Sequence, residues 1–533
     1  MRLLPIGIQD FVDIRERGFV YVDKTARIHQ LITGSGKPFF LSRPRRFGKS
    51  LLCSTLGAIF EGRRELFGEI AGRPALAIDS LNWEWKKHPV IRLDLNAGTY
   101  SNGVNELLSV LYAELRREAA KSGVTLENTD VKSQFKYLLE MVVRNTGEKA
   151  VVIIDEYDKP LMDTLNEPSI HDRIRKELKG FYGVLKSYDA YLRLVFLTGV
   201  TKFSRVSVFS DLNHLDDITL NPRYADICGW TQNELEQNFG PEINEVLEET
   251  GRNREEYMEN LRRFYNGYQF SKKPLTVYNP FGLLQHFNGD GDFSPYWYET
   301  ATPTFLVELV VKQKINLAML GELSVRDEDF RKYDSENMNA VPLLYQTGYL
   351  TITGYDEELQ TYKLNFPNDE VSASFAASLL KQYTQSKNEV AGNLNTKLAE
   401  ALLKGCLEDA MNVLRSFLAV IPYDIIRETE NYYQTAVHLI FTMLGFNCRT
   451  ELRLAAGRID ALVETKRFVY CFEFKLDKSA DEALAQIDTK DYLLPWNGSG
   501  KKLFKVGVGF NHEKRNIGEW KYEVVDTISY ILL

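Results

Sequence analysis

The residues best suited to chemistry stand near the N-terminus, where Gly48, Lys49 and Ser50 end a turn that follows the apolar run 39–41. In a phosphate-binding loop of this kind, backbone N–H groups and a helix N-terminus hold the phosphates, and the lysine reaches the same oxygens. The serine hydroxyl binds Mg²⁺. The loop pattern has glycine where this chain has Arg43. An ordinary helix start with a Lys-Ser pair is therefore the alternative interpretation.

Arginines in the same loop favour phosphate binding. Arg43, Arg45 and Arg46 bring three guanidinium groups to the place where phosphates would lie. Guanidinium groups suit the planar recognition of anions. We therefore expect all three to contact the nucleotide.

A second signature of a nucleotide site is the apolar run 150–154, which ends in Asp155 and Glu156. This pattern predicts a buried parallel strand with carboxylates at its C-terminal tip. In P-loop ATPases the first acid holds Mg²⁺ and a following glutamate polarises the attacking water. A strand that ends in a solvated acidic pair is the alternative, which the phosphate-loop pattern disfavours.

A third strand, expected at 192–198, ends in polar residues that could sense the γ-phosphate. Thr198, Lys202 and Arg205 are the candidates, and a positively charged loop without a ligand is an equal alternative. Together with the loop, this completes the predicted nucleotide-binding set: Arg43, Arg45, Arg46, Phe47, Gly48, Lys49, Ser50, Leu51, Asp155 and Thr198.

Four motifs carry a resemblance to a known family: the arginine-rich loop 43–50, Tyr-Val-Asp-Lys-Thr at 21–25, Ile-Asp-Glu-Tyr-Asp-Lys-Pro at 154–160 and Tyr-Asn-Gly-Tyr at 265–268. They resemble the AAA-ATPase-like family of large bacterial ATP-binding proteins, many of which end in a PD-(D/E)xK nuclease-like domain. In that family the position of Arg43 is not glycine. The resemblance implies a P-loop fold and ATP and Mg²⁺ as cofactors.

The bulk composition is that of an ordinary globular protein. The chain has 533 residues, 44% hydrophobic and 26% charged, with a net charge of −8. A chain of this length is too long for one core, and no global positive field indicates nucleic-acid binding. The five cysteines are scattered, which disfavours a disulfide framework or structural zinc site. Without a leader-like N-terminus or a membrane-length apolar run, we expect a cytoplasmic protein with no membrane partner.

Strand-like and helix-like segments alternate through the first half of the chain. Such alternation predicts a parallel sheet with helices on both faces, with ligands bound at the carboxyl ends of the strands. The expected strands are 39–41, 90–95, 151–154 and 192–198, and the expected helices are 50–60, 105–120, 132–144 and 172–186.

After residue 220 the regular alternation of strands and helices ends. Residues 221–303 are expected to form a helical lid rich in aromatic side chains. Helices followed by alternating strands at 349–353 and 360–364 suggest a winged-helix-like region. DNA contact and a packing spacer are both open interpretations, because the acidic tip 356–358 would repel phosphates.

The C-terminal hundred residues hold a second chemical constellation. Asp460 begins one expected strand, and Glu473 and Lys475 share a face of the next, while Phe472 and Phe474 point to the other side. Two converging carboxylates can bind a divalent cation, and the lysine can orient water or stabilise phosphate charge. A solvated ion pair on an amphipathic hairpin is the alternative.

This spacing resembles the PD-(D/E)xK nucleases, with Gly-Arg-Ile-Asp at 457–460 in place of the first element. Gln486 and Tyr492 resemble that group's additional Gln and Tyr element, and Glu430 is a weak candidate for a further acidic ligand. A phosphate-contacting basic edge and a solvated surface are equally compatible with the lysine-rich stretch: Lys501, Lys502, Lys505, Lys514 and Arg515.

The expected fold class is therefore α/β, with a P-loop NTPase sheet followed by a helical, winged-helix-like region and an α/β nuclease-like domain. The expected domains are a P-loop core at 1–220, a lid at 221–303, a connector at 304–424 and a PD-(D/E)xK nuclease-like domain at 425–533.

Three functions compete. The first is ATP hydrolysis coupled to a Mg²⁺-dependent nuclease, with Glu156, Asp460, Glu473 and Lys475 catalytic and Ser50, Asp155, Asp460 and Glu473 as metal ligands. The second is a nucleotide switch or scaffold whose nuclease-like domain binds nucleic acid without cutting it. The third is a ring-forming homo-oligomeric motor. Such a motor needs an arginine finger, and the sequence does not identify which arginine would serve as one.

Overall fold

The computed structural model describes residues 2–34, 38–202, 215–301, 304–313, 323–326, 330, 339–384, 388–420, 437, 439–442, 447–454 and 457–525. The chain divides into two compact units. The N-terminal unit comprises Met1–Ala301 and Ser324–Asn368, and the C-terminal unit comprises Thr302–Leu323 and Asp369–Leu533. The segment 304–424, expected to be one connector, contributes to both units.

A parallel sheet with the strand order β2–β3–β4–β1–β5 forms the centre of the N-terminal unit. Every residue of β3 is buried, as expected of a continuous apolar strand covered on both faces. The strands are β1 (Phe39–Ser42), β2 (Val90–Asp94), β3 (Ala150–Asp155), β4 (Leu192–Gly199) and β5 (Asp216–Asp217). The first four confirm the strands expected from the sequence.

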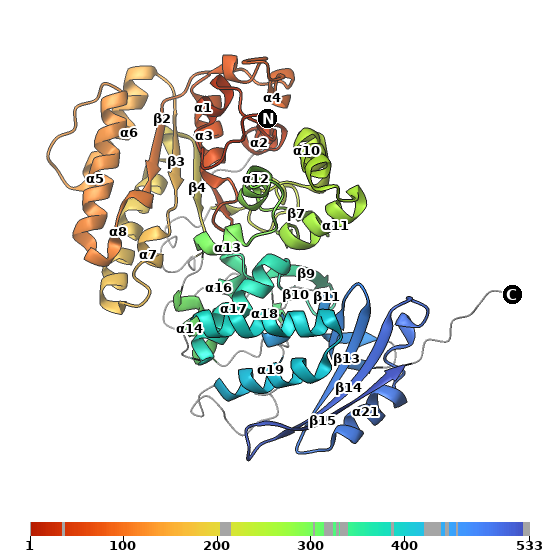
Figure 1. Ribbon diagram of the computed structural model, residues 1–533. Helices are drawn as coiled ribbons and strands as arrows, with labels where there is room; N and C mark the ends of the chain where they lie inside the picture. The colour runs from red at the N-terminus through yellow and green to blue at the C-terminus, as the bar shows by residue number, and fades with distance from the viewer. Residues whose placement is uncertain are drawn as a thin grey trace. The chain divides into compact units, whose positions relative to one another are not determined.

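Helices cover both faces of this sheet (Figure 1). On one side are α1 (Phe11–Glu16), α2 (Thr25–Thr33) and α3 (Lys49–Phe60); on the other are α5 (Val104–Lys121), α6 (Val131–Thr146) and α8 (Pro168–Ser187). Local sequence sets their ends: Asp130 accepts hydrogen bonds from the first turn of α6, and Gly147 ends it in the left-handed conformation. Two shorter helices are α4 (Ala77–Ser80) and α7 (Lys159–Met162). The P-loop NTPase architecture is thereby confirmed.

The segment 221–301, expected to form a lid, is mainly helical and belongs to the N-terminal unit. Its aromatic side chains form one core with Val20 and Val22 of the N-terminal segment. Thr231 and Glu234 make a reciprocal capping box at the start of α9. The elements are α9 (Gln232–Asn238), α10 (Gly240–Thr250), α11 (Arg254–Tyr265), β6 (Tyr268–Gln269), β7 (Thr276–Val277), α12 (Pro280–Asn288) and α13 (Tyr296–Ala301).

The predicted hairpin around Asp356 is confirmed, and it belongs to the N-terminal unit. β9 (Thr351–Asp356) and β10 (Thr361–Asn365) pair antiparallel, with β8 (Ser324–Arg326) on the far side of β10, and α16 (Ala340–Gln346) precedes them. The Gln269 N–H donates to the Thr351 hydroxyl at 2.7 Å. This hairpin is therefore joined to the aromatic-rich segment of its own unit.

The C-terminal unit combines helices with a mixed sheet of order β11–β12–β13–β14–β15, in which β13 and β14 are parallel and the other pairs antiparallel. The strands are β11 (Asn447–Leu454), β12 (Gly457–Glu464), β13 (Phe468–Leu476), β14 (Lys502–Asn511) and β15 (Asn516–Val525). The helices are α14 (Thr304–Lys312), α17 (Asp369–Thr384), α18 (Asn388–Lys404), α19 (Leu407–Val420) and α21 (Ala480–Thr489).

Side chains of β13 alternate between two cores. Phe472 and Phe474 pack with residues of α18 and α19, as the sequence predicts, whereas Cys471 packs with Leu484 and Ile487 of α21. Glu473 and Lys475 follow the parity of Cys471, so they lie on the face of the sheet that α21 covers.

Candidate functional site

The loop between β1 and α3 has the geometry of a phosphate cradle. Gly48 adopts a φ of 91°, in the left-handed region that favours glycine, and it directly precedes the first turn of α3. Aromatic side chains of the lid segment fix the loop. The Phe47 ring packs edge-on against Tyr268 at 4.8 Å, and the Trp297 indole N–H donates to the Arg45 carbonyl at 3.0 Å. The motif 265–268 thus acquires a structural role.

The phosphate loop and the acidic strand converge. Lys49 Nζ lies 3.3 Å from Glu156 Oε1 and 3.3 Å from the Pro44 carbonyl oxygen, and the Lys49 side chain is almost fully buried. The Ser50 side chain hydrogen-bonds the Asp155 carboxylate. The two predicted signatures therefore meet in space, although β4 separates their strands in the sheet.

The acidic strand ends in an unusual environment. Burial raises the pKa of Asp155 to about 6, and the neighbouring Glu156 adds to the rise, while the hydrogen bond with Ser50 opposes it. Glu156 has a φ of 51°, a conformation that costs free energy for a residue with a side chain. A hard cation at Ser50 and Asp155 would favour the ionised carboxylate, so these side chains fit Mg²⁺.

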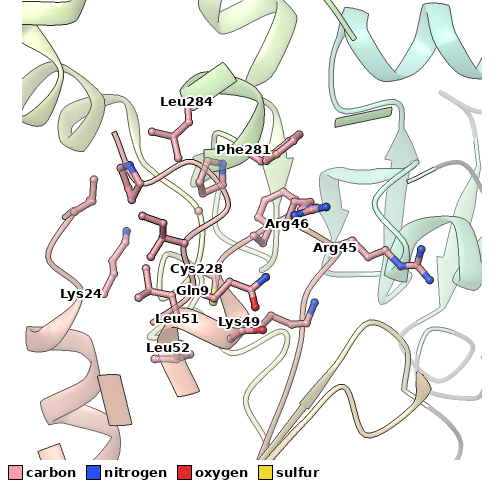
Figure 2. Close-up of a pocket in the computed structure, with 18 of the residues that line it drawn as sticks. Gln9, Lys24, Arg45, Arg46, Lys49, Leu51, Leu52, Cys228, Phe281 and Leu284 are labelled. Carbon is pink, nitrogen blue, oxygen red and sulfur yellow. The ribbon is translucent and has the colours of Figure 1, made fainter. Parts of the chain in front are cut away.

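A cavity of about 400 Å³ opens above the loop (Figure 2). Its polar part includes Lys49, Ser50, Glu156, Asn96 and Lys159. A mostly apolar part is lined by side chains that come from four separate segments: Ile8, Val20, Val22, Ile28, Ile227, Cys228, Trp230, Phe281 and Leu284. Charged and apolar walls in one cavity suit a phosphate chain joined to a flat, largely apolar ring.

The C-terminal unit brings its own constellation together. The β12–β13 register pairs Ala461 with Phe472, and its continuation by one residue sets Asp460 opposite Glu473. The Phe474 N–H donates to Asp460 Oδ2 at 2.8 Å. Lys475 Nζ lies 2.9 Å from Glu473 Oε1 and donates to Gln486 Oε1 at 2.7 Å.

These carboxylates could supply two ligands to a divalent cation, with water and a phosphate oxygen completing the shell. Among the described residues, no group of three or more His, Cys, Asp or Glu side chains forms a ready-made metal cluster. Tyr492 lies beside the site: its hydroxyl is 3.4 Å from Gln486 Nε2, and a side chain at Gly457 would meet that hydroxyl at 2.9 Å. The predicted Gln and Tyr element is thus assembled.

Both sites agree with comparisons to known proteins. Residues 5–209 match the profile of a family described as predicted AAA-ATPase, and residues 428–520 match the PD-(D/E)XK nuclease superfamily. A protein described as "uncharacterized protein in vnfD 5′ region", from Azotobacter chroococcum mcd 1, is 35% identical over 532 residues. That match covers 96% of this chain and 97% of the relative. The chain belongs to the AAA-ATPase-like family.

The predicted nucleotide residues of this AAA-ATPase-like protein fall into two groups. The cavity is lined by Arg45, Arg46, Phe47, Gly48, Lys49, Ser50, Leu51 and Glu156. Asp155 does not line it but is hydrogen-bonded to Ser50, which does. The Arg46 guanidinium stacks on Phe281 at 4.9 Å, and the Arg45 side chain extends away from Lys49 in Figure 2.

Arg43 differs from its predicted role. It is buried, and its guanidinium donates to the carbonyls of Ser42, Thr219 and Tyr224 at 2.8–3.0 Å and stacks on Phe270 at 4.2 Å. Because the guanidinium is committed to backbone oxygens, the structure places Arg43 in the scaffold under the loop rather than at the phosphates.

The predicted γ-phosphate sensors are also placed differently. The buried Thr198 hydroxyl donates to the Leu41 carbonyl at 2.8 Å, which ties β4 to β1. Lys202 forms an ion pair with Asp217 and does not line the cavity. Arg205 and the weaker candidate Glu430 lie outside the described residues.

Sequence reasoning missed Asp158. This buried carboxylate accepts hydrogen bonds from the Val200 and Thr201 N–H groups and the Thr201 hydroxyl, at 2.6–3.2 Å. Burial, with the charge of Glu156, raises the pKa of Asp158 to about 6. It ties the tip of the acidic strand to the end of β4. Its place two residues after Glu156 was the available signal.

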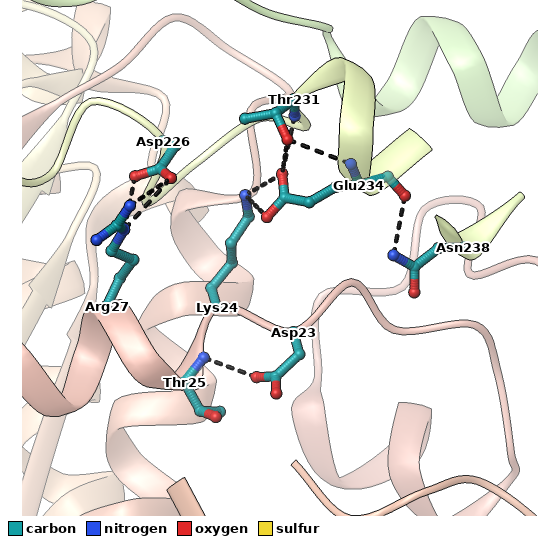
Figure 3. A network of polar contacts seen from close by, with 8 residues as sticks. All are labelled: Asp23, Lys24, Thr25, Arg27, Asp226, Thr231, Glu234 and Asn238. Carbon is teal, nitrogen blue, oxygen red and sulfur yellow. Dashed lines mark hydrogen bonds and ion pairs between the residues drawn. The ribbon is translucent and has the colours of Figure 1, made fainter. Parts of the chain in front are cut away.

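Lys24, in the motif at 21–25, was also missed. It lines the cavity and pairs with Glu234 at 2.6 Å, while Arg27 pairs with Asp226 at 3.0 Å (Figure 3). These ion pairs join the segment before the P-loop to the start of the lid helices. The motif therefore connects a wall of the cavity to α9.

Two of the five residues in the lysine-rich stretch of the C-terminal unit form ion pairs. Lys501 contacts Glu464 at 2.7 Å, and Lys505 forms an ion pair with Asp488. Among the described residues, no helix is both long and apolar enough to cross a membrane.

Proposed function

We propose that this protein binds and hydrolyses ATP and that its C-terminal unit is a metal-dependent nuclease acting on nucleic acid. The convergence of Lys49, Ser50, Asp155 and Glu156 at one cavity supports the first activity most strongly. The juxtaposition of Asp460, Glu473 and Lys475 supports the second.

At the ATP site, Lys49 and the loop N–H groups bind the β- and γ-phosphates. Ser50 and Asp155 would hold Mg²⁺, which would neutralise phosphate charge. Glu156 orients a water molecule and accepts its proton. The water oxygen bonds to the γ-phosphorus while the bond to the bridging oxygen breaks, so ADP leaves. The apolar wall around Trp230 and Phe281 takes the adenine ring.

At the nuclease site, Asp460 and Glu473 would hold a divalent cation, which would supply Lewis acidity. Lys475, held by Gln486, orients the attacking water towards the phosphodiester. The water oxygen bonds to phosphorus and gives a proton to the solvent, the ester P–O bond breaks, and the leaving oxygen takes a proton from the solvent.

The test is cleavage of mixed DNA and RNA substrates by the full chain with Mg²⁺ or Mn²⁺, with and without ATP. Lys475→Ala is the inactive variant. Lys478→Ala is its matched control, because Lys478 is exposed and its ion pair with Glu482 is long, at 3.8 Å. Cleavage that is lost in Lys475→Ala and kept in Lys478→Ala supports the nuclease, and dependence on ATP supports coupling.

ATP hydrolysis is measured on the same preparations, with Glu156→Gln as the variant expected to bind ATP without turning it over. Nucleic-acid binding without cleavage under every condition would favour the alternative, a nucleotide-dependent switch whose nuclease-like domain binds but does not cut. No ATP binding by the unaltered chain would reject the proposal for the N-terminal unit.

A further inference from the structure

Lys159 is a cation of the ATP cavity that the roles above do not use. It lines the same cavity as Lys49 and Glu156, and its N–H donates to the Glu156 carbonyl at 3.0 Å. Its ammonium pairs with Asp163, four residues along the chain, and both side chains are about a quarter exposed. The backbone of Lys159 is therefore joined to the residue that would position the water, and its ammonium forms a local, partly solvent-accessible ion pair.

Three other cations in or beneath the cavity are held by partners of their own. Lys49 contacts Glu156 and the Pro44 carbonyl, and Lys24 pairs with Glu234 of the lid. Arg43 is held by three carbonyls beneath the loop. The Lys159–Asp163 pair is local and partly solvent-exposed. Such i,i+4 pairs contribute little to stability, so Lys159 can exchange its partner at small cost.

A phosphate that Lys49 binds, and that a water molecule held by Glu156 attacks, has to lie within reach of both side chains. Lys159 follows Glu156 by three residues, at the start of α7. Phosphoryl transfer spreads negative charge over the γ-phosphate oxygens, and P-loop enzymes place an additional cation there. Lys159 is a further cation in the lining of the cavity that Lys49 and Glu156 also line.

We propose that Lys159 recognises the γ-phosphate, exchanging the Asp163 carboxylate for the phosphate oxygens when a nucleoside triphosphate fills the cavity. This inference rests on the proposed function of the N-terminal unit. It makes Lys159 a catalytic residue supplied by the same chain, and it makes Asp163 the group that holds Lys159 when a diphosphate is bound.

The experiment measures dissociation constants of the full chain for ATPγS and for ADP, both with Mg²⁺, together with steady-state ATP hydrolysis. Lys159→Ala removes the cation, and Lys159→Arg keeps the charge. Lys176→Ala is the matched control, because Lys176 forms a comparable i,i+4 pair with Asp172 and does not line the cavity.

In Lys159→Ala, we expect ATPγS affinity to fall about tenfold or more while ADP affinity changes less than about twofold, since one charge-assisted phosphate contact is lost. Turnover should fall with it, and Lys159→Arg should restore part of both. In Asp163→Asn, ATPγS affinity should rise, because its competitor for Lys159 is gone. Lys176→Ala should match the unaltered chain.

Equal losses of ATPγS and ADP affinity in Lys159→Ala would overturn the inference, because a structural role or general phosphate attraction predicts that result. Unchanged affinities and turnover would overturn it as well. Both outcomes leave the proposed ATPase standing, whereas an unaltered chain that binds neither nucleotide rejects that proposal itself.

Discussion

Lys49 Nζ lies 3.3 Å from Glu156 Oε1, which joins the phosphate loop to the acidic strand across the intervening strand β4. The contact brings together a cation that suits phosphate and a carboxylate that suits water activation. Glu156 reaches it from a left-handed backbone conformation, with a φ of 51°. A non-glycine residue keeps such a conformation only where the surroundings enforce it, and these positions are enriched in active sites.

Nucleotide binding should depend on pH through Asp155. Burial raises the pKa of Asp155 to about 6, and only the ionised carboxylate binds Mg²⁺ well. The Mg²⁺-dependent gain in ATP affinity should therefore shrink as the pH falls below about 6. At lower pH the decrease should approach about tenfold for each pH unit. Titration of a fluorescent ATP analogue with Mg²⁺ or with EDTA isolates this gain. A gain that stays constant from about pH 5 to 8 would contradict the prediction.

The same carboxylate should lower stability at neutral pH. A carboxyl whose pKa is raised in the folded state favours folding at acidic pH, and this stability is lost as the pH rises from about 4 to about 6. At pH 7 without Mg²⁺, the free energy of unfolding of Asp155→Asn should therefore be about 1–3 kcal/mol higher than that of the unaltered chain. Urea unfolding at pH 7 and at about pH 4 measures the difference, which should disappear at the lower pH. Asp158 remains in both chains, so part of the pH dependence persists.

Arg43 should matter for folding rather than for phosphate affinity. Arg43→Met leaves the buried carbonyls of Ser42, Thr219 and Tyr224 without their donor, so we expect a loss of about 3 kcal/mol or more in the free energy of unfolding. Arg45→Met, at an exposed position of the same loop, should change stability by less than about 0.5 kcal/mol. Thermal unfolding compares the two. Equal stability of both variants would show that Arg43 is not a scaffold residue.

Gly199 should resist substitution because of Asp158. A Cβ atom at Gly199 would lie 2.1 Å from Asp158 Oδ1 and 2.7 Å from a Tyr157 ring carbon. Gly199→Ala should therefore cost about 1–3 kcal/mol of stability and disturb the acidic strand. Gly57→Ala is the control: nothing lies within 4 Å of its Cβ in helix α3, so it should be neutral or stabilising. Denaturant midpoints decide, and a neutral Gly199→Ala would mean that the two strand tips are not tightly joined.

A substitution at the nuclease site should remove cleavage and leave ATP hydrolysis intact. Asp460→Asn should abolish cleavage while ATP affinity and turnover change less than about twofold, because the nucleotide residues belong to the other unit. Asp481→Asn, which alters only an exposed carboxylate paired with Lys521, should cleave normally. A gel-based cleavage assay and an ATPase assay on the same samples test this. Cleavage retained in Asp460→Asn would remove Asp460 from the proposed metal ligands.

The local chemistry of both sites follows from short stretches of the chain. Gly48, Lys49 and Ser50 form their cradle from consecutive backbone atoms, and the acidic pair at 155–156 needs only a buried strand to carry it, so both could be predicted. The same holds for Glu473 and Lys475, whose shared face follows from the two-residue period of a strand.

The tertiary structure decided which neighbours each side chain met. Arg43 and Thr198 could have reached phosphate, but the strand order places backbone carbonyls nearer to both. Asp158 and Lys24 have partners that are far away in the chain, on the end of β4 and at the start of α9. Burial and pKa depend on these distant contacts, because both are set by everything that excludes water from a group. No local pattern contains that information.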